Sequence, residues 1–391
     1  MPVLFKRILF RIHWICGLAA GIVLAVVGVT GALIGFEAEF LKLLNPAMHV
    51  SAEGRGVPKT PDVLTAAARI AYPDSTPRGI TWEGDDEPVT IRMAQGRERG
   101  VQVAVDPYTG AVLGVPRGTG FFEGAEQLHR SLAAGPVGKQ IVGASTAMLI
   151  VLALSGLYLR WLRRPRSLSA WFRFDFSLSG RAFMWRLHAV AGTWLLLFYL
   201  LAALTGLWWS YDFYRAAVNR IAGVTTPARR PPQTGETPPL PIDRAWLAFR
   251  NAVPDATRAT VALSGKTDAP LEIRYLTATS PHDRAFSTLK VDAASGEIAA
   301  REPYAELPRG RRFVSSIFPL HSGSFFGTPG RVLVALAALL MPFFAVTGIW
   351  LWMLRRRSEA ARTARLKQPD PVVAIAQRSF ADSPATDLRA Q

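Results

Sequence analysis

The chain consists of four long apolar runs separated by polar stretches. The apolar runs cover residues 15–36, 141–159, 189–209 and 332–354. Each holds about the 20 apolar residues that an α-helix needs to cross a bilayer. The first run is too long for a signal-peptide core and has no small-residue cleavage site after it, so we expect it to be retained. The pattern predicts an α-helical integral membrane protein with four transmembrane helices.

Two longer polar segments, 37–140 and 211–330, lie between these runs. Each begins with apolar residues at helical spacing and continues with short alternating runs typical of strands. The predicted helices are 61–72 and 242–252, and the predicted strands are 79–82, 89–93, 101–105, 111–115, 260–263, 271–275, 286–291 and 297–299. Both segments also contain an aspartate four residues before a glycine, a spacing that suits a tight turn. These turns run from Asp106 to Gly110 and from Asp292 to Gly296. We therefore expect two small α+β domains.

Basic residues outnumber acidic ones, 45 to 29, for a net charge of +16. Such a balance could favour nucleic acid, but the basic residues gather beside the ends of the apolar runs, on one side. They are Lys6, Arg7, Arg11, Arg160, Arg163, Arg164, Arg166, Arg181, Arg186, Arg355, Arg356 and Arg357. The positive-inside rule then places both termini and the loop 163–186 in the cytoplasm. We expect no nucleic-acid partner.

The predicted organisation follows from the spans and their orientation. It comprises a cytoplasmic N-terminus with the first transmembrane helix (1–36), a first outer domain (37–140), the second helix (141–162), a cytoplasmic loop (163–186), the third helix (187–210), a second outer domain (211–330), the fourth helix (331–354) and a cytoplasmic tail (355–391). The Pro-rich stretch 227–241 is expected to be an extended linker, and the polar tail to be disordered.

Two sets of residues recur at constant offsets along the chain. Arg11, His13, Gly17, Thr30-Gly31 and Glu37 recur as Arg186, His188, Gly192, Thr205-Gly206 and Asp212; Leu128-His129, Gly138, Gly156 and Arg163 recur as Leu320-His321, Gly330, Gly348 and Arg355. Each unit contains two spans, so both copies enter the membrane in the same sense. This predicts two parallel repeats, with a pseudo-twofold axis along the membrane normal.

Four of the six histidines belong to these repeats. His13 and His188 stand at the cytoplasmic starts of the first and third spans, whereas His129 and His321 precede the second and fourth. At about 1.5 Å per residue, the helix from His13 to Gly31 rises roughly 27 Å, nearly the whole hydrocarbon layer. The only pairs at equal depth are therefore His13 with His188 and His129 with His321.

Two symmetric imidazoles suit a haem better than a zinc ion. Zinc takes three or four protein ligands, and no Cys, Asp or Glu is repeated beside these histidines. Two histidines complete the coordination of haem iron and favour electron transfer. Gly17 and Gly192, one turn beyond His13 and His188, leave room for a flat ring, and Arg11 and Arg186 could pair with propionates.

Two plainer interpretations stay open for these residues. The glycines also suit close helix packing, and any one interfacial histidine can simply hydrogen-bond at headgroup level. His49 and His282 have no counterpart in the repeat and are expected to be ordinary surface residues.

The single cysteine, Cys16, excludes a disulfide framework, a CxxC redox pair and CxxCH haem attachment. No Walker loop or strand-linked GxGxxG indicates a site for ATP or a nicotinamide.

At these residues the chain resembles the PepSY-associated transmembrane family of bacterial inner-membrane proteins. The resemblance rests on Arg-x-His-x3-Gly at the first and third spans, Leu-His ahead of the second and fourth, and the two Asp-to-Gly turns, and it covers roughly residues 5–357. It implies periplasmic locations for the two α+β domains, which would be PepSY-like.

Within that family the chain is most similar to siderophore-iron reductases of the ferrioxamine reductase type. This likeness implies two haems b with His13, His188, His129 and His321 as axial ligands of the iron. It also implies that electrons cross the membrane, reduce a ferric siderophore of hydroxamate type in the periplasm and release Fe(II). The electron donor is not implied and could be a quinol or a reductase. No substrate motif can be matched, so the substrate residues are not implied.

Three other functions compete with this one. A PepSY-type periplasmic binding or regulatory membrane protein would carry no chromophore. A metal or haem transporter would need acidic residues along its path, and the interiors of the four runs hold none. A quinone-linked cytochrome with a non-iron substrate fits the histidines equally well.

Overall fold

Four stretches in the computed structural model are long and apolar enough to cross a membrane, one for each predicted run. The structure describes residues 2–95, 100–161, 167–225, 242–263 and 270–367. The first three stretches are α1 (Pro2–Ile34), α5 (Gly135–Trp161) and α7 (Gly180–Ser210). The fourth contains α11 (Gly327–Leu339) and α12 (Met341–Lys367).

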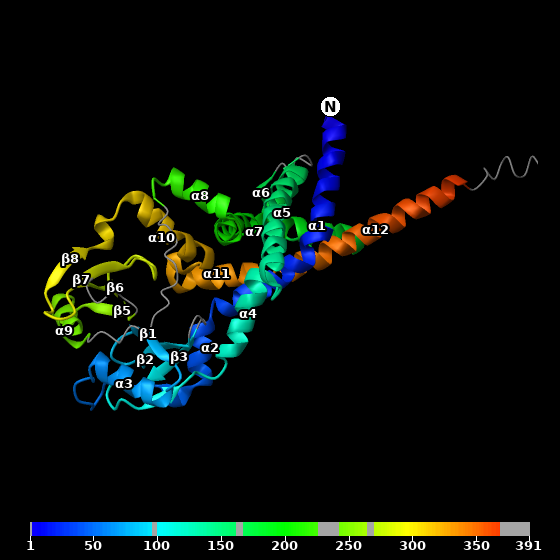
Figure 1. Ribbon diagram of the computed structural model, residues 1–391. Coiled ribbons are helices and arrows are strands. Elements are labelled where there is room, and N and C mark those ends of the chain that lie inside the picture. Colours follow the sequence, from blue (N-terminus) through cyan, green and yellow to red (C-terminus); the bar gives the residue numbers. More distant parts are fainter. Residues whose placement is uncertain (1, 96–99, 162–166, 226–241, 264–269, 368–391) are drawn as a thin grey trace, which may run out of the picture.

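The long helices pack around a shared apolar centre. Both α1 and α7 contact α5 and α12. In Figure 1, α7 is seen nearly end-on while α1 and α5 lie close to the plane of the picture, so α7 crosses them instead of running alongside. The centre is formed by Ala20, Leu24, Leu149, Tyr199, Ala203 and Ala337.

The fourth stretch is broken into two helices at Leu340. Pro342 follows the break, and a proline lacks the N–H for a helical hydrogen bond and clashes with the carbonyl four residues before it. That carbonyl belongs to Ala338, and α1 packs against it through Gly28. A Cβ added at Gly28 would collide with the Ala338 carbonyl oxygen and lie 2.8 Å from Met341 Cβ. The close approach of α1 to this break therefore requires a glycine.

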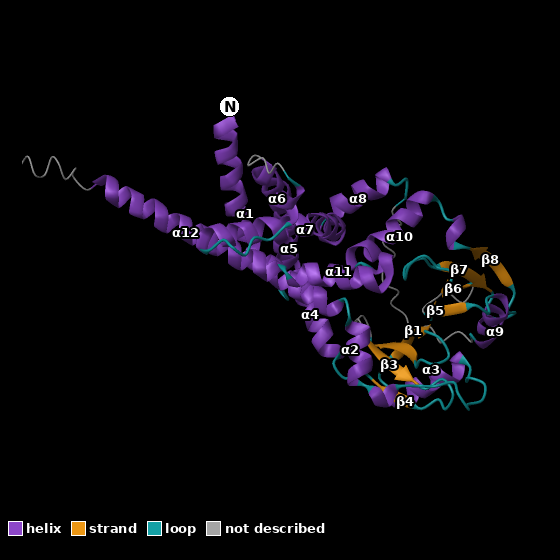
Figure 2. Cartoon of the chain, turned by 180° about the vertical axis from the view of Figure 1, so that it is seen from behind, coloured by secondary structure: helices purple, strands orange, loops and turns teal. Residues whose placement is uncertain are grey.

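The two polar segments form one antiparallel sheet with a single core. Its eight strands run in the order β4-β3-β2-β1-β5-β6-β7-β8. They are β1 (Thr76–Trp82), β2 (Val89–Ala94), β3 (Val101–Val105), β4 (Val112–Gly114), β5 (Ala256–Ala262), β6 (Leu271–Thr277), β7 (Ser287–Val291) and β8 (Ile298–Glu302). β1 pairs with β5, with Ile80 opposite Val261, which joins the segments that the pattern predicted as separate domains. Figure 2 shows the sheet at one end of the helical region.

Two short helices complete the core of the sheet. α3 (Pro61–Ala71) and α9 (Asp243–Ala252) bury Leu64 and Phe249 against the strands. Their first turns are linked reciprocally: the Asp62 carboxylate accepts the backbone N–H of Ile242 at 3.1 Å, and the Asp243 carboxylate accepts the N–H of Asp62 at 2.9 Å. Both predicted helices and all eight predicted strands are confirmed within a few residues at their ends.

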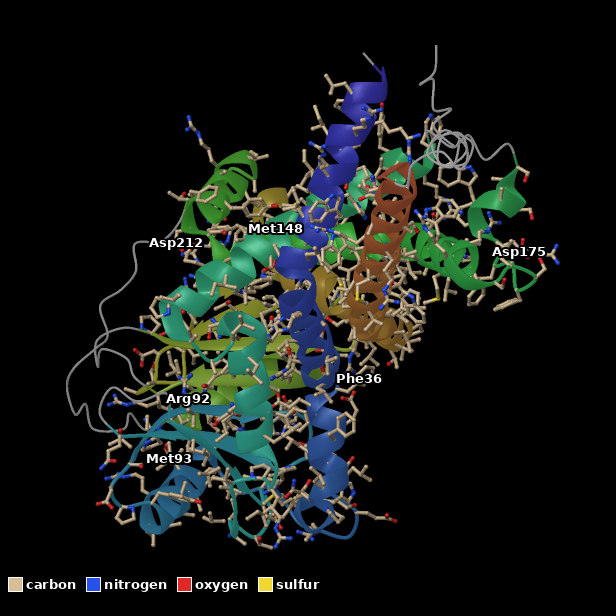
Figure 3. The ribbon with its side chains drawn as sticks, turned by 90° about the vertical axis from the view of Figure 1, so that its right-hand side faces the viewer. Phe36, Arg92, Met93, Met148, Asp175 and Asp212 are labelled. Atoms are coloured by element: carbon tan, nitrogen blue, oxygen red, sulfur yellow. The ribbon has the colours of Figure 1, made fainter. Side chains whose placement is uncertain are left out.

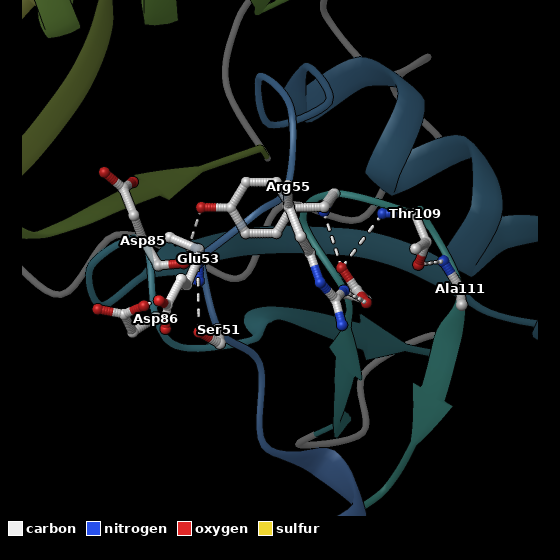
Figure 4. A network of polar contacts seen from close by, with 10 residues as sticks. Ser51, Glu53, Arg55, Asp85, Asp86, Thr109 and Ala111 are labelled. Carbon is white, nitrogen blue, oxygen red and sulfur yellow. Dashed lines mark hydrogen bonds and ion pairs between the residues drawn. The ribbon is translucent and has the colours of Figure 1, made fainter.

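Both predicted aspartate turns are also confirmed. The Asp106 carboxylate accepts the N–H of Tyr108 at 2.8 Å, and Gly110 has a φ of +76°. Asp106 is further held by Arg55 at 2.6 Å, in the network of Figure 4. Burial alone would raise the pKa of Asp106, but these hydrogen bonds outweigh it and hold the pKa below its ordinary value.

Several helices were not predicted. They are α2 (Glu37–Leu44), α4 (Thr119–Ser131), α6 (Leu168–Phe172), α8 (Asp212–Ile221), α10 (Arg309–Ser322) and the 3₁₀ turns η1 (Pro46–Met48), η2 (Tyr304–Glu306) and η3 (Ser324–Phe326). The prediction of a disordered tail from residue 355 is wrong for its first part, because α12 continues to Lys367 with an Arg355–Glu359 pair one turn apart. The rest of the tail and the predicted linker lie outside the described residues.

Replacement of Gly28 by alanine should destabilise the helical region. We expect Gly28→Ala to cost about 1–3 kcal/mol through overpacking. Gly21→Ala on the same helix is the matched control, since its Cβ would lie 3.5 Å from Ala345 Cβ, an ordinary contact. Thermal unfolding of the detergent-solubilised protein measures both, and equal melting temperatures would contradict the packing argument.

Candidate functional site

Two of the repeated histidines meet where the helical region joins the sheet. His129 lies near the end of α4 and His321 near the end of α10, and their ring centroids are 6.2 Å apart at an interplanar angle of 65°. We call them the proximal pair. Each of these helices is followed by a tight turn into the next helix, α5 or α11. A Cβ at Gly138 of α5 would collide with the carbonyl of Ser131, and a Cβ at Gly330 of α11 would collide with the carbonyl of Gly323, so both turns require glycine.

The spacing of the proximal pair matches two imidazoles on opposite sides of one metal ion. Two nitrogen–metal bonds of about 2 Å each, plus the radii of the two rings, separate the ring centres by about 6 Å. The observed 6.2 Å therefore fits an iron held between the rings.

Each proximal histidine has a polar partner at Nδ1. The Nδ1 of His129 lies 2.9 Å from the Val27 carbonyl oxygen and 3.5 Å from Thr30 Oγ1. The Nδ1 of His321 lies 2.9 Å from Thr205 Oγ1. Burial lowers the pKa of His129, and burial followed by the charge of His129 lowers the pKa of His321 to about 4. Both rings are therefore neutral near pH 7, as a metal-binding imidazole must be.

The other two repeated histidines form the distal pair, His13 of α1 and His188 of α7. His13 Nδ1 lies 2.8 Å from Ser155 Oγ, and His188 Nδ1 lies 2.7 Å from Thr347 Oγ1. Both helices that carry these histidines pack against both helices that carry their hydroxyl partners, since α1 and α7 each contact α5 and α12. The structure thus brings both members of each predicted pair into the same region.

The space between the pairs is filled by apolar and aromatic side chains. At about 1.5 Å per residue, α1 rises about 25 Å between His13 and Thr30. The Tyr199 hydroxyl donates to the Ala337 carbonyl at 2.9 Å, and the Phe344 ring contacts both Tyr199 and His188. The proximal and distal pairs are therefore two separate sites.

Glycine lies directly against three of the four imidazoles. A Cβ at Gly31 would fall 2.8 Å from His129 Cε1, one at Gly206 would fall 3.3 Å from His321 Cε1, and one at Gly156 would fall 3.2 Å from His13 Cε1. Gly17 and Gly192 lie instead against Leu152 and Phe344, where an added Cβ would make ordinary contacts at 3.7 and 3.6 Å.

The two arginines predicted to pair with propionates differ in their surroundings. Arg11 is exposed. Arg186 donates to the carbonyls of Arg173 at 3.0 Å and Ser169 at 3.4 Å, and it lines an open pocket of about 700 Å³ before the start of α7. In Figure 3, Asp175 of this pocket and Asp212, just after α7, lie on opposite sides of the bundle, with Met148 between them.

Arg160 has a structural role that its place in a basic cluster did not reveal. Its side chain at the end of α5 is only 5 % exposed. The guanidinium donates to the carbonyls of Ala189, Ala170 (2.8 Å) and Trp171 (2.6 Å) and to Thr193 Oγ1 (2.8 Å). Since Ala189 follows His188, Arg160 holds α5 and α6 against the part of α7 that carries the distal histidine.

The expectation that His282 is an ordinary surface residue is wrong, whereas His49 is exposed as predicted. His282 is 7 % exposed, and its Nε2 lies 3.1 Å from both Tyr304 Oη and Ser316 Oγ. Burial lowers the pKa of His282. These bonds fasten the β6–β7 loop to α10, the helix that carries His321, and the loop's polar sequence gave no sign of this packing.

Comparison with known families agrees with the arrangement of spans and sheet. A profile described as the PepSY-associated TM region matches residues 10–355. The chain belongs to this family. Together with the four apolar helices, membership makes the chain a multi-pass membrane protein with an α+β region. No curated protein matches the chain significantly.

Substitution of Arg160 should loosen the distal site. A lysine ammonium cannot reach four acceptors that a planar guanidinium reaches, so we expect Arg160→Lys to lower stability by about 2–3 kcal/mol. Arg181→Lys, at an exposed position near the start of α7, is the control. Thermal unfolding in detergent tests this, and identical melting curves for the two variants would show that the buried bonds contribute nothing.

Proposed function

We propose that the chain is a di-haem b-type oxidoreductase of the bacterial inner membrane that reduces ferric siderophore in the periplasm. One haem is held by His13 and His188, the other by His129 and His321. The proposal rests above all on the 6.2 Å separation of the proximal rings, which suits iron bound between two imidazoles. The occurrence of a second histidine pair, at the other end of the same helices, supports a relay of two redox centres.

Haem held by two histidines would supply one-electron transfer at each site. The residues of the chain contribute binding, orientation and the exclusion of water. The four imidazoles would bind the haem iron through Nε2, because Nδ1 of each is engaged with the protein. The apolar layer around Tyr199 and Phe344 keeps water out of the space between the sites.

The direction of transfer in this proposal follows from the basic residues. By the positive-inside rule, the arginines that flank the distal side face the cytoplasm, which places the sheet in the periplasm. Electrons then enter at the distal pair from a quinol or a cytoplasmic reductase.

A ferric hydroxamate is the acceptor that best suits the periplasmic end of this relay. Hydroxamate oxygens hold the hard Fe(III) ion strongly and Fe(II) poorly. One electron delivered from the proximal site converts the bound Fe(III) to Fe(II), and the chelator then releases the metal. The sheet beside the proximal pair provides the nearest extramembrane surface for such a chelate.

The purified protein should contain two haems b per chain. We expect a reduced-minus-oxidised visible spectrum with b-type bands, and a pyridine haemochrome count of two. His129→Ala/His321→Ala and His13→Ala/His188→Ala should each remove one haem, while His49→Ala removes none. A protein without haem, as a PepSY-type regulatory protein would be, overturns the proposal.

Ferric siderophore should reoxidise the dithionite-reduced protein. After removal of excess dithionite, a ferric hydroxamate is expected to restore the oxidised spectrum and yield Fe(II), captured by a ferrous-specific chelator. A gallium(III) hydroxamate of the same shape is the control, because it accepts no electron under these conditions. Reoxidation by a quinone but not by the iron chelate would favour a quinone-linked cytochrome instead.

A further inference from the structure

All four repeated histidines have the same kind of hydrogen-bond partner, a hydroxyl of a membrane span. Each span holds one Ser–Gly or Thr–Gly dipeptide, and the hydroxyl of that dipeptide faces Nδ1 of one histidine. The four pairs are His13 with Ser155, His188 with Thr347, His129 with Thr30 and His321 with Thr205. We call each dipeptide an imidazole seat.

The carbonyl three residues before the hydroxyl belongs to the same arrangement. Val27 precedes Thr30 by three residues, and its carbonyl oxygen lies 2.9 Å from His129 Nδ1. Leu152 and Ala202, three residues before Ser155 and Thr205, likewise hydrogen-bond to His13 and His321 through their backbones. A carbonyl can only accept, so Nδ1 of His129 carries the proton.

At the other three seats the hydroxyl donates to its own helix, which assigns the same tautomer. Ser155 Oγ lies 3.3 Å from the Leu152 carbonyl, Thr205 Oγ1 lies 2.6 Å from the Leu201 carbonyl, and Thr347 Oγ1 lies 2.8 Å from the Phe343 carbonyl. A hydroxyl has one hydrogen, which is donated to the helix carbonyl. Each hydroxyl oxygen must therefore accept from the imidazole, which again assigns the proton to Nδ1.

The missing side chain of the glycine in the dipeptide leaves space for the imidazole ring. Gly31, Gly206 and Gly156 each have a histidine Cε1 at a distance that a methyl group would crowd. Gly348 is the exception, with open space where its Cβ would be. Three seats therefore limit the ring position on two sides, through the hydroxyl and the bare backbone.

We infer that Ser155, Thr347, Thr30 and Thr205 are positioning residues that fix the Nδ1–H tautomer of the four histidines and direct each Nε2 toward its binding partner. The identity of that partner as haem iron rests on the proposed function. A hydrogen bond from the non-ligating nitrogen fixes the ring and raises the basicity of the ligating nitrogen, and losing it typically costs about 10–100-fold in metal affinity.

The seats are not equivalent. His129 keeps the Val27 carbonyl when Thr30 is replaced, because its Nδ1 lies 2.9 Å from that oxygen and 3.5 Å from the hydroxyl. His321 likewise keeps the backbone of Ala202 when Thr205 is replaced. His188 Nδ1 lies 2.7 Å from Thr347 Oγ1, so replacement of Thr347 should have the largest effect.

The experiment compares Thr347→Val with Thr205→Val and Thr30→Val in the full-length protein in detergent. We expect haem transfer to an excess of a high-affinity acceptor apoprotein to accelerate about 10–100-fold for Thr347→Val. The effects of Thr205→Val and Thr30→Val should be less than about threefold, because a backbone carbonyl remains at each of these two seats. Thr146→Val is the matched control, since its hydroxyl donates to its own helix carbonyl, Val142, at 2.8 Å.

Two further readouts separate positioning from simple loss of structure. In Thr347→Val the midpoint potential of the haem of His13 and His188 should rise, because a less basic imidazole stabilises Fe(III) less, and Thr347→Ser should keep the original value. The haem of His129 and His321 should be unchanged in Thr347→Val. An unchanged transfer rate and potential in Thr347→Val would overturn the inference.

A haem-free measurement tests the tautomer directly. In the apo-protein labelled with ¹⁵N-histidine, each seated imidazole should show a protonated Nδ1 and an unprotonated Nε2. Thr347→Val should make His188 a mixture of tautomers. If the protein proves to hold no haem, this result still decides the inference, and protonated Nε2 at the four histidines would reject it.

Discussion

Placing an imidazole close to hydrocarbon costs free energy unless its nitrogens have hydrogen-bond partners. The helical region supplies such a partner to each of the repeated histidines. Every repeated histidine places Nδ1 against a hydroxyl or carbonyl of a membrane helix. Inside a bilayer these helix atoms have no water with which to form hydrogen bonds. The hydroxyl donates its hydrogen to a carbonyl of its own helix, so its oxygen accepts a hydrogen bond from the histidine. The result is a set of neutral rings, each with one nitrogen held and the other available.

The length of α1 and α7 links the two sites. Each of these helices carries a distal histidine near its start and a proximal seat about 25 Å further on. His13 and Thr30 therefore serve different sites from one rigid element, as do His188 and Thr205. A shift of either helix along its axis would disturb both sites together. The tight contact of Gly28 with Ala338, between the two sites, resists such a shift on the α1 side.

The sequence predicted the parts of this structure that depend on local pattern. Spans, strands and aspartate turns follow from periodicity and turn chemistry, and the histidine pairs follow from the repeat combined with topology. The pairing of β1 with β5 could not be foreseen, because two edge strands with the same alternation fit many partners. Arg160 and His282 were misjudged for a related reason: their burial is created by segments distant in sequence, α7 and α10. Ser155 and Thr347 were missed although they stand beside glycines already noted, because a hydroxyl in a span usually bonds only to its own helix.

The orientation of each histidine ring and the distance between paired rings depend on different contacts. Each histidine and its seat belong to the same half of the chain, residues 2–161 or 167–367, so the orientation of a ring is decided within a half. The distance between paired rings depends instead on contacts between the halves. These contacts include the packing of α1 on α12 and of α5 on α7, the β1–β5 ladder, the bonds of Arg160 to α7, and the bidentate bond of Arg331 to Glu39 at 2.6 and 2.9 Å. Changes at these contacts should therefore alter the gap in which a cofactor is held while leaving the tautomers intact. Changes at the seats should do the reverse, since the halves remain docked when one hydroxyl is lost.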